Sequence, residues 1–280
     1  MRIEDYPPQE PLPEIARDFH ERMMAAGEGV EAVEYSFGEN PSQSIAVHPS
    51  GVADAPVLLF LHGGGWTNGY KEQMAFLAPA LNAEGITLVS ASYRLAPAHV
   101  FPANFEDVVD AVAKTVAVAP AHGFDPRRLF IGGHSAGGHL AALAALDESW
   151  QGARGLSADI IKGCLPLSAT YDFTPGNGGN VRPRFLGPEG TFSEVRASPL
   201  FRIGQRKPPF HISFGTADIA HLPDQARKFA MVYRAAGGEA DMLELPDATH
   251  IDVMLQAPVL EKPWLPAAVG WMRRIASHLE

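Results

Sequence analysis

The sequence predicts an α/β fold in which helices cover both faces of a mostly parallel central sheet. From about residue 56 onward, apolar runs of strand length alternate with amphipathic runs of helix length, a pattern typical of βα units. The strand expected at residues 56–62 is a continuous apolar run, as burial on both faces requires. The 280 residues are 46% hydrophobic and show no internal repeat. We therefore expect a single domain over residues 1–280 with a large core.

The order of the expected elements follows from apolar periodicity and from Gly and Pro breaks. Residues 1–29 form a lead-in segment with a helix, because Ile15, Phe19 and Met23 recur at i, i+4 and i+8. Two edge strands are expected at 30–37 and 43–48. After residue 62 we expect helix 71–83, strand 86–92, helix 105–119, strand 128–132, helix 136–146, strands 160–167 and 210–214, helix 223–236, strand 240–245 and helix 266–278.

One long segment, residues 173–209, interrupts the alternation of strands and helices. It is too rich in Gly and Pro for long regular elements, yet it is longer than an ordinary connection. It follows the strand at 160–167, at the sheet edge where ligands bind in parallel α/β folds. The segment is therefore expected to form a small lid or cap over a site.

Residues 133–137 read Gly-His-Ser-Ala-Gly between an expected strand and an expected helix. In that context G-x-S-x-G forms a sharp, strained turn that projects the serine hydroxyl above the sheet. Gly133 and Gly137 allow the backbone to approach its neighbours closely. Ser135 is thus the predicted nucleophile.

A serine nucleophile needs a general base, and the base needs a third group that orients it. On such a fold the chain order is Ser, acid, His. Asp218 follows the strand at 210–214 and His250 follows the strand at 240–245, so both are expected on the same side of the sheet as Ser135. Three other acids remain open as alternatives: Asp224, Asp247 and Asp252.

Residues 62–66 read His-Gly-Gly-Gly-Trp and suit the approach of a carbonyl oxygen to backbone amides. The expected oxyanion donors are the amides of Gly64, Gly65 and Ala136, with Gly63 in reserve. The run is not interpreted as a phosphate loop, because no Lys-Ser/Thr pair follows it and it lacks the G-x-G-x-x-G pattern.

Four side chains are expected to contact substrate. Trp66 is the nearest large ring that can bound the acyl side, and His134 flanks the serine inside the turn. The lid is basic in an otherwise acidic chain, so Arg182 and Arg184 are candidates for clamping a substrate carboxylate. A solvated basic loop is the alternative for these arginines.

The composition of the chain argues against two classes of binding partner, nucleic acids and membranes. The net charge of −10 offers no general attraction for nucleic acid or an anionic membrane surface. No apolar run is long enough to span a bilayer, and the N-terminus lacks a signal-peptide pattern, so a cytoplasmic protein is expected. Its partner is then a small-molecule ester or amide, and a homodimer is left open.

Cys164 is the single cysteine, so no internal disulfide can form, and its apolar strand-like surroundings indicate a core position. No spacing of His and Cys resembles a zinc motif. We therefore expect neither a metal nor another cofactor.

These motifs together resemble the α/β-hydrolase superfamily, and within it the hormone-sensitive-lipase-like esterases and the kynurenine formamidases (arylformamidases). Residues 62–65 are similar to the esterase oxyanion motif, and residues 93–97 (Tyr-Arg-Leu-Ala-Pro) to the segment after it. Residues 133–140 and 167–173 look closer to the formamidase branch. That branch typically has an aromatic residue where Gly65 stands, and this difference favours the esterases.

The resemblance implies an α/β-hydrolase fold, a triad of Ser135, Asp218 and His250, and no cofactor. The expected activity is that of a serine hydrolase that cleaves small carboxylic esters through an acyl-enzyme. The alternative is a hydrolase of N-formyl aryl amides such as N-formylkynurenine. A non-catalytic binding protein on the same scaffold is the third hypothesis, since fold does not determine function.

Overall fold

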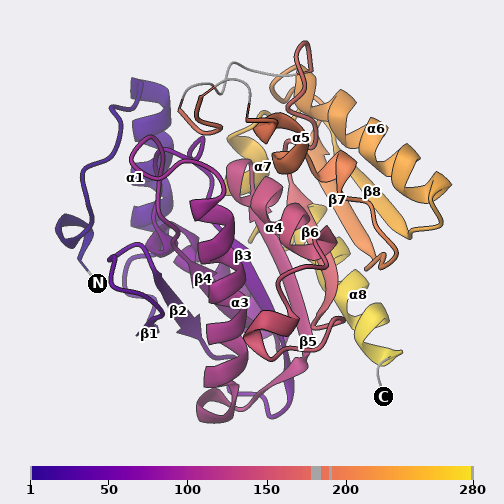
Figure 1. Cartoon of the computed structure of the whole chain (residues 1–280). Helices are drawn as coiled ribbons and strands as arrows, with labels where there is room; N and C mark the ends of the chain where they lie inside the picture. Colours follow the sequence, from indigo (N-terminus) through magenta and orange to yellow (C-terminus); the bar gives the residue numbers. More distant parts are fainter. Residues whose placement is uncertain (1, 178–183, 189–190, 279–280) are drawn as a thin grey trace.

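The computed structural model describes residues 2–177, 184–188 and 191–278, which contain one eight-stranded sheet. Its strands are β1 (Val33–Ser36), β2 (Ser44–His48), β3 (Ala55–Leu61), β4 (Thr87–Ala91), β5 (Phe124–His134), β6 (Ile161–Leu167), β7 (Phe210–Gly215) and β8 (Ala240–Leu245). They lie in the order β1-β2-β4-β3-β5-β6-β7-β8 (Figure 1). β2 is antiparallel to β1 and β4, and the other pairs are parallel. The predicted mostly parallel sheet is therefore confirmed.

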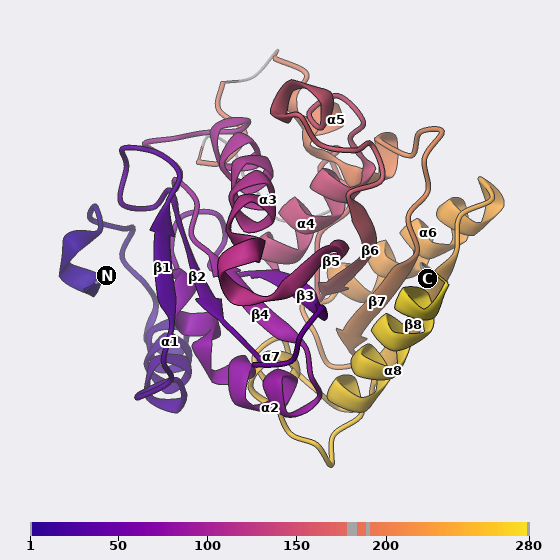
Figure 2. The same cartoon turned by 90° about the horizontal axis from the view of Figure 1, so that it is seen from below.

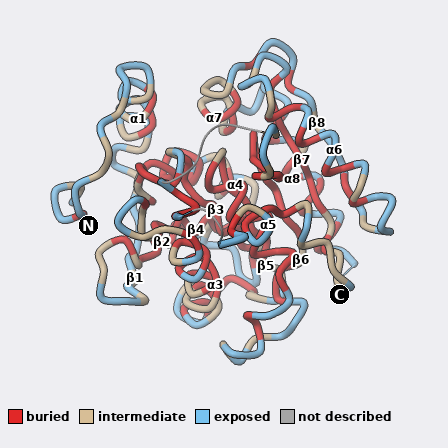
Figure 3. Tube along the Cα trace, turned by 45° about the horizontal axis from the view of Figure 1, so that its top comes forward, coloured by how far each residue is buried: buried red, intermediate tan, exposed pale blue. Residues whose placement is uncertain are grey.

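Helices cover both faces of the sheet (Figure 2). One face carries α3 (Ala103–His122), α4 (Ala136–Leu146) and α6 (His221–Ala235); the other carries α1 (Glu14–Ala26), the 3-10 helix η2 (Lys71–Leu77), α2 (Ala78–Ala83), α7 (Asp252–Leu255) and α8 (Trp264–Ser277). Short elements lie in the connections: η1 (Ile3–Asp5), η3 (Gly152–Arg154), α5 (Ser193–Ala197) and η4 (Pro199–Phe201). Burial is concentrated in the central strands and the inner helix faces (Figure 3). None of the helices in the described ranges is long and apolar enough to cross a membrane.

The sequence predicts neither α7 nor the short elements of the connections, and β1 is shorter than expected. Two further differences have a physical reason. The helix expected at 71–83 is divided into η2 and α2, because Pro79 has no N–H to donate to the carbonyl of Ala75 and so interrupts a continuous α-helix. β5 begins earlier than expected, at Phe124, where it pairs with Ala55 of β3. A strand start of this kind depends on a partner distant in the sequence, which apolar periodicity does not reveal.

The described parts of the segment at residues 173–209 begin at the end of the sheet where β6 finishes, and the chain then returns to the start of β7 (Figure 1). These parts include α5 and η4. The side chains of Phe185 and Ala197 are fully buried, and the Ser198 hydroxyl accepts a hydrogen bond from the Phe173 amide at 2.8 Å. The segment is therefore packed into the core at its base instead of forming a detached surface loop.

α4 passes the sheet at very short range. A Cβ atom added to Gly133 would lie 2.5 Å from the carbonyl carbon of Gly137, and one added to Gly137 would lie 2.3 Å from the carbonyl oxygen of Leu61 in β3. Both contacts are with backbone, which has no alternative rotamer to adopt. Glycine at these two positions therefore sets the distance between the helix and the strands.

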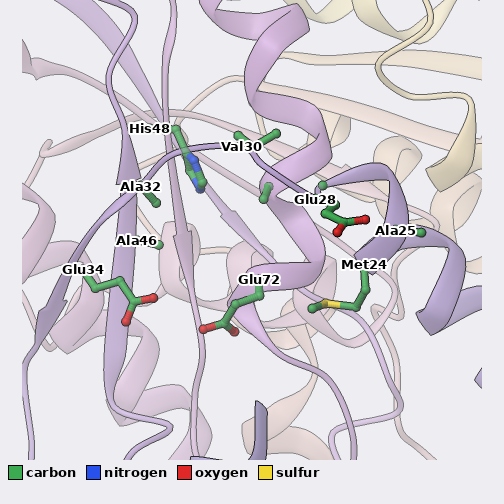
Figure 4. A pocket seen from close by; sticks show the side chains of 11 residues that line it. Met24, Ala25, Glu28, Val30, Ala32, Glu34, Ala46, His48 and Glu72 are labelled. Atoms are coloured by element: carbon green, nitrogen blue, oxygen red, sulfur yellow. The ribbon is translucent and has the colours of Figure 1, made fainter. Parts of the chain in front are cut away.

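A charged network fastens the N-terminal segment to η2 beside a cavity of about 540 Å³ (Figure 4). Lys71 is fully buried, and its Nζ lies 2.6 Å from Glu72, 2.8 Å from the Tyr6 hydroxyl and 3.6 Å from Glu34. The Tyr6 hydroxyl in turn donates to Glu72. Both carboxylates and the His48 ring line the cavity, which is bounded by the end of α1, β1, β2 and η2 (Figure 4). No predicted site residue lines this cavity.

His211 is a buried histidine on β7, with its ring 5.7 Å from that of Trp271. Neither ring nitrogen has a hydrogen-bond partner among the described residues. Burial lowers the pKa of His211 from 6.5 to about 4. The imidazole is therefore neutral at pH 7 and resists protonation in the folded state.

The glycine contacts predict opposite effects for the same substitution in two helices. Gly137→Ala should lower the free energy of unfolding by more than about 2 kcal/mol, because the new methyl group meets backbone. Gly270→Ala in α8 is the matched control. Nothing lies within 4 Å of its added Cβ, so helix propensity should raise stability by about 0.5–1 kcal/mol. Urea unfolding of both variants measures this, and equal effects would contradict the close approach of α4.

His211 predicts a pH-dependent loss of stability. Its folded pKa of about 4 lies below the ordinary 6.5, so between these values the unfolded state binds more protons and the free energy of unfolding falls as pH drops. His211→Leu should remove up to about 1.4 kcal/mol per pH unit of that slope and leave stability at pH 7 unchanged or higher. Thermal unfolding from pH 7 to 4.5 tests this, and an unchanged slope would show that His211 is not the group titrating.

Candidate active site

Ser135 occupies the predicted turn between β5 and α4, with φ 53° and ψ −115°. A positive φ is unfavourable for a non-glycine residue and persists only where the surroundings impose it. Here the Ser135 amide donates to the carbonyl of Leu167 in β6 at 2.9 Å, and its carbonyl accepts from the His139 amide at 3.0 Å. The serine is thus held in a strained conformation at the carboxyl end of the sheet.

Asp218, His250 and Ser135 form one hydrogen-bonded chain. His250 Nε2 lies 2.9 Å from Ser135 Oγ, and His250 Nδ1 lies 2.8 Å from Asp218 Oδ1. Because the carboxylate can only accept, Nδ1 carries the proton and Nε2 accepts from the serine hydroxyl. The three residues, which are far apart in sequence, follow β5, β7 and β8 at the same sheet edge.

The three rival acids lie elsewhere. Asp224 is 3.5 Å from Arg227, and Asp252 caps Thr249 with hydrogen bonds to its amide and hydroxyl. Asp247 is exposed in the loop that precedes the histidine. Among the described carboxylates, Asp218 is therefore the one that contacts the His250 ring.

The Asp218 side chain is fully buried, and both of its oxygens accept hydrogen bonds from the protein. Its Oδ1 also accepts from the Ile219 amide at 2.7 Å, and its Oδ2 accepts from the Ser168 hydroxyl. Burial opposes ionisation, but the hydrogen bonds from His250 and Ser168 outweigh it, and the pKa of Asp218 is lower than its usual value. The carboxylate is therefore ionised at neutral pH. Sequence reasoning missed Ser168, whose only signal is its place directly after β6.

His134 is hydrogen-bonded to the backbone of His250 and packs beside its ring. Its Nε2 donates to the carbonyl oxygen of His250 at 3.0 Å, and the two rings lie 4.6 Å apart. His134 is 2% exposed, and burial, with the neighbouring His250, lowers its pKa to about 3. This neutral ring holds the loop that carries His250. His134 is predicted to contact substrate, but its buried side chain leaves little surface for that contact.

The glycine loop after β3 lies against the turn that carries Ser135. A Cβ added to Gly63 would lie 2.9 Å from His134 Nδ1 and 3.4 Å from Ser135 Cβ. Gly64 and Gly65 have positive φ, at 105° and 61°. Within the described residues, the amides of Gly64, Gly65 and Ala136 donate to no protein acceptor. The loop that carries two of these amides thus lies beside Ser135 through Gly63, and the third amide opens α4 directly after Ser135.

Two contacts that the sequence did not suggest fix this loop. The His62 ring stacks on Tyr93 at 4.3 Å, and the Tyr93 hydroxyl donates to the His62 carbonyl at 2.9 Å. From the other side, the Gln9 side chain pairs with both the amide and the carbonyl of Gly69, at 2.8 and 3.0 Å. The N-terminal segment, through Gln9, thus fixes the chain that follows the glycine loop at Gly69.

Trp66 joins the glycine loop to the lid. Its ring is only 7% exposed and stacks on Phe185 of the lid at 4.5 Å. Its Nε1 donates to His139 Nδ1 at 3.0 Å, and His139 Nε2 donates to the carbonyl of Ala197 at 2.7 Å. Burial lowers the pKa of His139 to about 4, so the ring stays neutral and can accept. Trp66 therefore packs beneath the lid, with little surface left for a substrate.

The two predicted arginine clamps differ in what the structure shows of them. Arg182 lies outside the described residues. Arg184 is 66% exposed, and its Nη2 lies 4.0 Å from Glu10. The other arginines of the lid have internal partners: Arg196 lies over the Phe101 ring, Arg202 pairs with Asp147, and Arg206 bonds to the carbonyl of Ile161.

No group of His, Cys, Asp and Glu within the described residues is arranged to hold a metal ion. Cys164 is buried in β6, and burial raises the pKa of its thiol well above the usual value. A protonated, inaccessible thiol is a poor nucleophile. Cys164 is therefore not a rival to Ser135 as a candidate nucleophile.

Known proteins share both the sequence pattern and the fold. Esterase LipC of Mycobacterium tuberculosis is 31% identical over 241 residues, which are 76% of this chain and 58% of LipC. Isoprenylcysteine alpha-carbonyl methylesterase ICME of Arabidopsis thaliana is 27% identical over 80% of this chain and 57% of its own length. The chain thus spans less than two thirds of these curated relatives. A solved esterase of Pyrobaculum calidifontis has a TM-score of 0.75 at 23% identity and covers 94% of this chain and 92% of that chain.

A family model described as the alpha/beta hydrolase fold matches residues 58–254. This span begins at the glycine loop's strand and includes the Ser135 turn, Asp218 and His250. The match covers most of the chain and agrees with the sheet order and with the resemblance expected from the motifs. The chain therefore belongs to the family of proteins with the alpha/beta hydrolase fold.

Proposed function

We propose that the protein is a serine hydrolase that cleaves small carboxylic esters through an acyl-enzyme intermediate. The observation that carries this proposal is the unbroken chain from Ser135 Oγ to His250 and Asp218, with distances of 2.9 and 2.8 Å. Nucleophile, base and orienting acid are all in hydrogen-bond contact before substrate binds. The esterases among its relatives support the same substrate class.

The proposed reaction has two halves. His250 Nε2 removes the hydroxyl proton as Ser135 Oγ attacks the ester carbonyl, and ionised Asp218 stabilises the imidazolium that forms. The imidazolium then protonates the leaving alkoxide, which leaves an acyl group on Ser135. Water attacks this acyl-enzyme by the same steps, with His250 again first base and then acid. The acid is released and the serine hydroxyl is restored.

The oxyanion of each tetrahedral intermediate would be held by backbone amides. The free N–H groups of Gly64, Gly65 and Ala136 support this role, and Gly63 is a reserve donor because it lies against Ser135. Each such donor contributes about 2.7–4 kcal/mol to the transition state. Ala136 also opens α4, so the positive end of the helix dipole faces the developing charge.

The second candidate activity is hydrolysis of N-formyl aryl amides by the same residues. The closed packing of Trp66 against Phe185, Phe173 and His139 is consistent with a small acyl group, and formyl is the smallest. An amide requires His250 to protonate a poor leaving nitrogen, whereas an ester leaves readily. Esters are therefore the first proposal.

Replacing each triad residue should remove nearly all turnover. Ser135→Ala, His250→Ala and Asp218→Asn should each lower kcat on p-nitrophenyl acetate by about 1,000-fold or more, because the three groups act as a unit. Asp247→Asn is the matched control and should retain wild-type kcat, since this exposed acid does not contact His250. Substantial activity in folded Ser135→Ala would rule out the mechanism, and a greater loss in Asp247→Asn would overturn the choice of acid.

Acyl-chain length should separate the two candidate activities. We expect kcat/KM to be highest for short acyl p-nitrophenyl esters and to fall as the chain lengthens, because the closed packing of Trp66 on Phe185 would have to be displaced to make room for a longer chain. The same preparation is assayed on N-formylkynurenine. A preference of tenfold or more for the formyl amide, about 1.4 kcal/mol at the transition state, would replace the esterase proposal with the formamidase one.

A further inference from the structure

We propose that Ser168 is a positioning residue of the catalytic acid: its hydroxyl holds Asp218 Oδ2, so that Oδ1 faces the imidazole of His250. The proposal rests on the serine hydrolase mechanism above and adds a fourth member to the hydrogen-bonded chain. The described partner of the Ser168 hydroxyl is the Asp218 carboxylate, so Ser168 is expected to act on the reaction through that carboxylate.

The backbone at Ser168 is built to aim this hydroxyl. The residue directly follows β6, is fully buried and has φ 52°, a left-handed conformation that is unfavourable for serine. Its amide donates to the carbonyl of Ser213 in β7 at 2.8 Å, and β7 is the strand that leads to Asp218. Strained residues persist where the surrounding structure requires them, often at active sites.

The hydrogen bonds of Asp218 are divided between its two oxygens. Oδ1 accepts from His250 Nδ1 and from the Ile219 amide, at 2.8 and 2.7 Å. For Oδ2, the hydroxyl of Ser168 is the described partner, and it must donate, because an ionised carboxylate only accepts. The terminal torsion of aspartate has a broad rotational well. Without the hydroxyl, Oδ2 has no described partner, and the carboxylate plane is held through Oδ1 alone.

A double-mutant cycle separates positioning from general structural damage. Ser168→Ala should lower kcat on p-nitrophenyl acetate about tenfold with KM unchanged. In an Asp218→Asn background the same substitution should cost little, because its target is already lost. Ser90→Ala is the matched control: Ser90 is a fully buried strand serine whose hydroxyl has no partner among the described residues, and kcat should not change. Equal losses from Ser168→Ala in both backgrounds would overturn the proposal.

A second variant separates the hydroxyl from the strained backbone. Ser168→Gly removes the hydroxyl but tolerates φ 52°, so it should be at least as stable as Ser168→Ala and equally slow. Recovery of wild-type kcat in Ser168→Gly would show that backbone strain, and not the hydroxyl, accounts for the loss in Ser168→Ala.

A spectroscopic measurement tests the proposal independently of turnover. The proton between His250 Nδ1 and Asp218 Oδ1 should give a low-field resonance in the proton NMR spectrum of the wild type. We expect this resonance to shift or broaden in Ser168→Ala and to stay in place in Ser90→Ala. A wild type without esterase activity would refute the proposed function, while the NMR comparison would still decide on Ser168. An unchanged resonance in Ser168→Ala would overturn the positioning role.

Discussion

The site depends on the contact between α4 and the ends of β3 and β5. Gly137 of α4 lies directly against the Leu61 carbonyl of β3. A single residue, Ser135, connects the end of β5 to the start of α4. Ser135 has a strained, positive φ. The same contact brings the glycine loop beside the turn, since this loop is the continuation of β3. Ser135 and the glycine loop are thus placed by one steric constraint.

The parts predictable from sequence are those whose signals are local or ordered along the chain. The turn at Ser135 is visible because its glycines, its strand and its helix are adjacent in sequence. Asp218 and His250 are predictable because the carboxyl ends of parallel strands meet at one edge of the sheet. Residues that directly follow such strands are therefore expected to lie close together. In the structure, the His250 ring is hydrogen-bonded to Asp218 on one side and to Ser135 on the other.

The parts not predicted depend on contacts between distant segments. The bond of Ser168 to Asp218 and the bonds of Gln9 to Gly69 each join parts of the chain separated by 50 residues or more, and neither leaves a periodic pattern. Trp66 was expected to face substrate, because the sequence does not show that Phe185 covers its ring. Which side of a buried ring is free is decided by such packing.

The hydrogen bonds through His139 have a mechanical consequence. This ring accepts from the glycine loop and donates to the carbonyl of Ala197, and because burial lowers its pKa to about 4, it is neutral at pH 7. Lifting the lid would break the stack on Trp66 and leave the buried ring of His139 with an unpaired N–H. The packing of Trp66 on Phe185 and the hydrogen bonds of His139 thus tie residues 185 and 197 to the glycine loop, so these two parts of the chain can separate only if both kinds of contact break together.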